Sequence, residues 1–77
     1  PPESETQLLA LVRSNVKNPD PEWCWYIAHS GGAGWLTRSL RWREPHMALD
    51  WQTQDRAEQA LALLTPGIAE VVPDPRR

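Results

Sequence analysis

The sequence predicts a small α+β domain, a two-layer sandwich in which helices pack on one antiparallel sheet of about three strands, in the order α-β-β-α-β. Two observations carry this prediction. The stretch 23–42, WCWYIAHSGGAGWLTRSLRW, has the composition of two apolar strands joined by a glycine turn. Apolar residues at helical spacing flank this stretch on both sides, and such stripes need a sheet to cover them.

A first stripe of apolar residues recurs at helical spacing and consists of Leu8, Leu11, Val12 and Val16. It predicts a helix over about Glu5–Arg13. Ser4 and Gln7 match a capping box, in which each side chain satisfies a free backbone N–H at the other position. The prolines of the run 15–21, NVKNPDP, end the helix, because the residue before a proline is pushed out of helical geometry.

The run Glu22–His29 is too aromatic and β-branched to favour a helix, so we expect a strand. Both of its faces are apolar, with Trp23, Trp25 and Ile27 on one and Cys24, Tyr26 and Ala28 on the other. This pattern is typical of a central strand that is covered on both sides, or covered on one side and adhesive on the other. The run 30–34, SGGAG, then supplies the turn of a hairpin.

We expect the return strand over Trp35–Arg43. Alternation places Leu36, Leu40 and Trp42 on one face, and Trp35, Thr37, Ser39, Arg41 and Arg43 on the other. Arg38 interrupts the inward set. Either a bulge or turn lies near 37–39, or the strand consists of two short pieces.

The rest of the chain completes the sandwich. Residues 47–51 form a short strand or a packed loop, and Thr53 caps a second helix that 65–67 ends. A last strand, Ile68–Val72, follows. A crossover over the first strand gives the strand order 2-1-3, all antiparallel. The whole chain, 1–77, is one domain with flexible tails at 1–3 and 73–77. The apolar residues of the second helix are Ala57, Ala60, Leu61 and Leu64.

Composition excludes several classes of protein. The 77 residues contain one cysteine, Cys24, which rules out an internal disulfide and a multi-cysteine zinc site and favours a reducing, cytoplasmic location. No apolar run approaches the length of a membrane span, so no membrane partner is expected. The net charge of −2 supplies no general basic field for nucleic acid.

No set of residues predicts a reaction, so we expect a protein that is not an enzyme, with no cofactor, metal or small-molecule substrate. His29 and Ser30 are adjacent in sequence, which is poor placement for a base and its nucleophile. The glycine run lacks the lysine of a phosphate-binding loop. Cys24, His29, His46 and Asp50 match no zinc-ligand spacing.

The candidate interface consists of tryptophan and arginine residues of the return strand: Trp35, Arg38, Arg41, Trp42 and Arg43, with Trp23 as a possible addition. Three interpretations compete. Arginine and tryptophan are enriched at protein-interface hot spots. Aromatic stacking with arginine also holds single-stranded nucleic acid. The third interpretation is a solvated outer strand whose arginine stems cover tryptophan rings.

From Trp25 onward the chain resembles short uncharacterised proteins of bacteria and their phages or prophages. The shared pattern is an aromatic strand (WYIAH), a glycine turn, GWLT, a strand with RW, and an A-x-x-W-x-T lead-in to a helix and a strand. The resemblance covers Trp23–Val72 and implies a fold and a bacterial or phage source, with no catalytic residue. We therefore expect an interaction module that binds a protein partner or itself, with inhibition of a host complex as one role and single-stranded nucleic acid as the alternative ligand.

Overall fold

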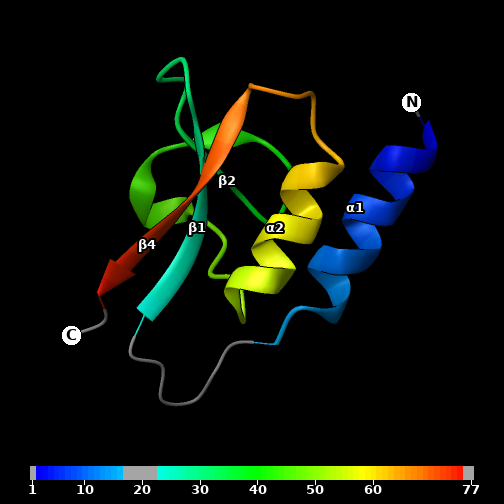
Figure 1. The fold of residues 1–77 in the computed structure, drawn as a ribbon, viewed down its shortest axis with the longest axis horizontal. Helices are drawn as coiled ribbons and strands as arrows, with labels where there is room; N and C mark the ends of the chain where they lie inside the picture. Colours follow the sequence, from blue (N-terminus) through cyan, green and yellow to red (C-terminus); the bar gives the residue numbers. More distant parts are fainter. Residues whose placement is uncertain (1, 17–22, 76–77) are drawn as a thin grey trace.

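The computed structural model describes residues 2–16 and 23–75. These form an α+β fold in which the second α-helix packs against one antiparallel sheet and the first α-helix lies beside the second (Figure 1). The sheet has four strands in the order β3-β2-β1-β4, one more than the sequence predicts. The predicted order survives within it, because β1 lies between β2 and the last strand. The elements are α1 (Pro2–Ser14), β1 (Trp23–His29), β2 (Trp35–Leu36), β3 (Trp42–Arg43), the short 3-10 helix η1 (Pro45–Met47), α2 (Gln54–Ala62) and β4 (Ala69–Pro75).

Helix α1 begins earlier than its sequence signals predict. It starts at Pro2, so Ser4 lies inside the first turn and the predicted capping box is wrong. Proline is well suited to a first helical position, where its missing N–H would have no intrahelical partner. Leu8 and Val12 are buried, as their spacing predicts, whereas Val16 is 65% exposed and does not belong to the stripe.

The long strands β1 and β4 pair antiparallel along their whole length, with Ile27 opposite Val71. Ile27 is fully buried against the helices. Strand β4 continues beyond the predicted end at Val72, through Pro73 to residue 75, which an edge strand permits because a proline can leave its missing donor on the free side. Positions 73–75 thus lie in β4, and 2–3 lie in α1. The other residues of the predicted tails, 1, 76 and 77, lie outside the described residues, as do 17–22, which include most of the predicted helix stop.

Strands β2 and β3 form a tight hairpin in place of one long return strand. Trp35 pairs with Arg43 and Leu36 with Trp42, which confirms the alternative of two short pieces. The Thr37 N–H donates to the Arg41 carbonyl at 2.9 Å, and the Thr37 hydroxyl accepts from the Arg41 N–H at 3.2 Å. Thr37 is buried, although alternation along one long strand places it on the same face as Trp35 and Arg43.

The segment after η1 is a packed loop that lies alongside β1, where a further strand of the sheet would otherwise lie. The Trp51 N–H donates to the Trp25 carbonyl at 2.9 Å, and the Trp51 side chain is 1% exposed. Asn15, just after α1, fixes the loop from the other side. Its Nδ2 donates to the Asp50 carbonyl at 2.9 Å and its Oδ1 accepts from the Gln52 N–H at 2.8 Å.

Helix α2 follows this loop, and its predicted cap is confirmed: the Thr53 hydroxyl accepts a hydrogen bond from the Arg56 N–H. Its buried alanines complete a core between helices and sheet that consists of Leu8, Val12, Ile27, Leu36, Leu49, Trp51, Ala57 and Ala60. The opposite face of the sheet carries neither α1 nor α2. We call it the outer face.

Candidate functional site

A row of four residues crosses the outer face, one from each strand. Ile27 and Leu36 point to the core, so their strand neighbours Ala28 and Trp35 point to the outer face. Residues paired across strands share a face, and the pairings join Glu70 to Ala28, Ala28 to Trp35, and Trp35 to Arg43. We call Glu70, Ala28, Trp35 and Arg43 the charged row. It spans three strand spacings, about 14 Å.

The charged row has a carboxylate at one end and a guanidinium at the other. Glu70 and Arg43 are both exposed, at opposite edges of the sheet. The Arg43 Nη1 donates to the Trp42 carbonyl at 3.0 Å, and neither Glu70 nor Arg43 forms an ion pair within the described part of the chain. The large ring of Trp35 lies beside the small side chain of Ala28. One half of the row therefore has the negative charge and the small side chain, and the other half has the large ring and the positive charge.

An aromatic groove of about 400 Å³ lies beside this row. The rings of Tyr26 and Trp35 meet edge to face, with centroids 5.9 Å apart. Val72 lies opposite Tyr26 on β4, and η1 closes the groove with Pro45 and His46. The groove thus offers apolar surface between strands and a short helix, which suits the burial of partner side chains.

The structure brings only part of the predicted interface together. Trp35 and Arg43 share the outer face, and Arg41 is exposed in the turn before β3. Trp42 pairs with Leu36 and therefore points to the helix side, where its ring packs edge to face on His29 at 4.9 Å. Trp42 is not an outer-face residue.

Two further candidates also lie elsewhere. Arg38 lines a separate hollow of about 250 Å³ with Asn15, Met47, Ala48, Leu49 and Asp50. Trp23 is 46% exposed, but it has the strand parity of Trp25 and Ile27, so it belongs to the helix side of the sheet. The residues of the candidate interface are therefore divided between the two faces of the sheet and a separate hollow.

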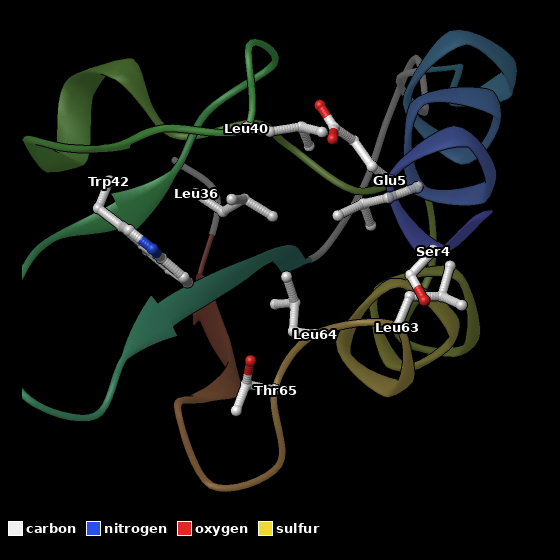
Figure 2. Close-up of a pocket in the computed structure, with 9 residues that line it drawn as sticks. Ser4, Glu5, Leu36, Leu40, Trp42, Leu63, Leu64 and Thr65 are labelled. Atoms are coloured by element: carbon white, nitrogen blue, oxygen red, sulfur yellow. The ribbon is translucent and has the colours of Figure 1, made fainter. Parts of the chain in front are cut away.

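A second hollow, of about 300 Å³, opens between α1, the β2–β3 hairpin and the end of α2 (Figure 2). Leu36, Leu64 and Trp42 point into it, and the Glu5 carboxylate lies near Leu40 at its rim (Figure 2). Its floor is the main core, since Leu8 and Leu36 are at most 5% exposed. This hollow is therefore an open end of the main core, with the Glu5 carboxylate at its rim.

The groups that the sequence offers for catalysis lie apart. His29 accepts a hydrogen bond at Nδ1 from the Gly31 N–H at 2.9 Å, so this imidazole holds the hairpin turn. His46 lines the aromatic groove, Asp50 lines the hollow with Arg38, and Cys24 is buried. Within residues 2–16 and 23–75, no three His, Cys, Asp or Glu side chains gather as a metal site would require.

The free edge of β4 is poor in hydrogen-bond donors. The Ser30 N–H donates to the Ile68 carbonyl at 2.8 Å, so β1 and β4 exchange bonds at residues 68, 70 and 72 of β4. The backbone groups of Ala69, Val71, Pro73 and Pro75 therefore point to the free edge, where the two prolines have no N–H. At the other end of the sheet, β3 has two residues. The outer face, and not an edge, is the larger surface for a partner.

Sequence reasoning missed half of the charged row and most of the groove. Ala28 and Tyr26 were visible as the alternate positions of the aromatic strand, and Glu70 and Val72 as those of the last strand. Their register across β1 was not visible, because it depends on pairing between residues more than 40 positions apart.

Comparison with known proteins adds no assignment: the sequence matches no protein-family model and no curated protein, and the fold matches no solved structure. In the described part of the chain, neither helix has the length and apolar character that crossing a bilayer requires.

Proposed function

We propose that this chain is a non-enzymatic interaction module that docks a protein surface through its outer face. The observation that carries the proposal is the arrangement of that face: an aromatic groove beside a row that ends in two exposed charges of opposite sign. Aromatic anchors surrounded by polar residues are typical of protein interfaces. The buried thiol of Cys24 accords with a cytoplasmic location, which we propose for this module together with a bacterial or phage origin.

A protein partner fits this face better than nucleic acid does. A single-stranded nucleic acid needs several cations along one path beside stacking rings. On the outer face, Arg43 is the arginine beside Trp35, while Arg38 lies at a different hollow. Glu70 at the other end of the row would repel phosphate. Blocking a host complex remains one role that such a module could serve.

Site-specific photo-crosslinking in bacterial cells tests the proposal. A photoreactive amino acid replaces Val72, which lines the groove, and in a control protein it replaces Glu58, which is exposed on α2. We expect discrete protein adducts from position 72 and none from position 58. The Trp35→Ala substitution in the position-72 protein should abolish the adducts, with the circular dichroism spectrum unchanged.

Equal adducts from both positions, or adducts that do not respond to Trp35→Ala, would contradict the proposal. The nucleic-acid alternative is tested by fluorescence anisotropy with a labelled single-stranded oligonucleotide at low salt. Binding that weakens steeply with added salt and is lost with Arg43→Glu would replace the protein proposal by the alternative.

A further inference from the structure

We infer that the outer face binds a second copy of this chain, in a symmetric dimer in which the charged rows of the two copies lie against each other. The inference rests on the proposed function, and it specifies the partner. It follows from the order of the four side chains in the row, which is Glu70, Ala28, Trp35 and Arg43. When two such rows face each other in opposite directions, each charge meets the opposite charge and each large side chain meets a small one.

The symmetry follows from the geometry of stacked sheets. Two identical sheets pack face to face when the two-fold axis lies in the plane between them. If the axis runs along the strands, it keeps the strand direction and exchanges the β4 side of one copy with the β3 side of the other. The two sheets are then aligned, as in ordinary β-sandwiches, with about 10 Å between them.

This rotation brings opposite charges together. Glu70 of one copy faces Arg43 of the second copy, and the same contact recurs on the other side of the axis, as a two-fold interface requires. Both residues are exposed and, within the described residues, form no ion pair that would compete. A row with like charges at both ends would repel its own copy, so the sign change along the row favours self-association.

The same rotation brings a large residue onto a small one. Trp35 of one copy lies over Ala28 of the other, and this pairing also occurs twice. The single methyl group of Ala28 takes up less of the space between the sheets than a larger side chain would, which favours a position for the indole ring there. Charge and size are therefore consistent with the same register.

Reversal of the charges gives a sharp test. We expect Arg43→Glu and Glu70→Arg each to weaken self-association by about tenfold or more, because each places two like-charged pairs in the dimer. An equimolar mixture of the two variants should associate again, since a mixed dimer restores both opposite pairs. The matched controls Arg13→Glu and Glu58→Arg change charge equally on the exposed helix surface and should leave self-association unchanged.

Sedimentation velocity over a concentration series measures each association constant, and circular dichroism verifies that each variant is folded. A wild-type protein that stays monomeric throughout the series overturns the inference. The inference is equally overturned if neither charge reversal changes the association constant, or if the mixture of the two variants associates no better than each variant alone. If the protein is monomeric but still gives adducts from position 72, the dimer inference is wrong and the proposed function stands. If it is monomeric and gives no adducts, both are wrong.

Discussion

The glycine at position 34 sets the distance between β2 and β3. Its φ is +128°, and a Cβ at this position would lie 2.5 Å from the Arg43 carbonyl oxygen and 3.0 Å from the Arg43 nitrogen. Both contacts are with backbone, so no side chain can rotate away. We therefore expect Gly34→Ala to separate the hairpin that holds Trp35 opposite Arg43, in addition to straining its own backbone.

Gly32 provides a matched control in the same turn. Its φ is +85°, but a Cβ there meets nothing within 4 Å, so Gly32→Ala pays only for the left-handed backbone, about 1–2 kcal/mol. Gly34→Ala adds the steric clash, and we expect it to lower the free energy of unfolding by at least about 3 kcal/mol. This is a large part of the roughly 4–11 kcal/mol expected for a chain of this length.

Urea unfolding, followed by tryptophan fluorescence and circular dichroism, measures both variants. The difference between them reports the contact with Arg43 together with the greater backbone strain of alanine at +128° than at +85°. Equal losses of stability, within about 0.5 kcal/mol, would refute the close approach of the two backbones as the reason for glycine at position 34.

Three other substitutions test the remaining supports of the fold by the same unfolding assay. Thr53→Ala removes the hydroxyl that caps α2 and should cost about 1 kcal/mol, whereas Thr53→Ser should cost much less. Asn15→Ala removes both hydrogen bonds to the loop at Asp50 and Gln52, and a loss of about 1–3 kcal/mol is expected; Asn15→Asp keeps only the acceptor and should not restore the wild-type value. Ile27→Ala opens a cavity under β1 and should cost about 2–5 kcal/mol, against about 1 kcal/mol for Ile27→Val; a small loss for Ile27→Ala would contradict its central place in the core.

Much of the fold could be predicted because its signals are local. The apolar spacing of Leu8 and Val12, the aromatic alternation of β1 and the threonine cap of α2 each act within a few residues. The β2–β3 hairpin was not predictable in the same way. Its turn places Leu40, a residue without turn preference, at a φ of +61°, and the hydrogen bonds of Thr37 hold it there.

The candidate site was predictable only in part, and the reason is again the range of the contacts. Trp35 and Arg43 were selected by type, and their shared face was visible from alternation. Glu70 joins them through β1, at a register that tertiary packing sets. Trp42 was included by residue type, although it pairs with Leu36 and therefore lies on the helix side, away from Trp35 and Arg43.

The two prolines at the end of β4 also limit how large any assembly of this protein can become. A sheet whose edge offers a full set of donors can recruit strand after strand and grow into a fibre. Here an incoming strand finds N–H groups only at Ala69 and Val71 along the outward side of β4, and β3 is too short to offer more. Among the described residues, growth by edge pairing is therefore suppressed at both ends of the sheet, so repeated addition of strands is not a route to a larger assembly.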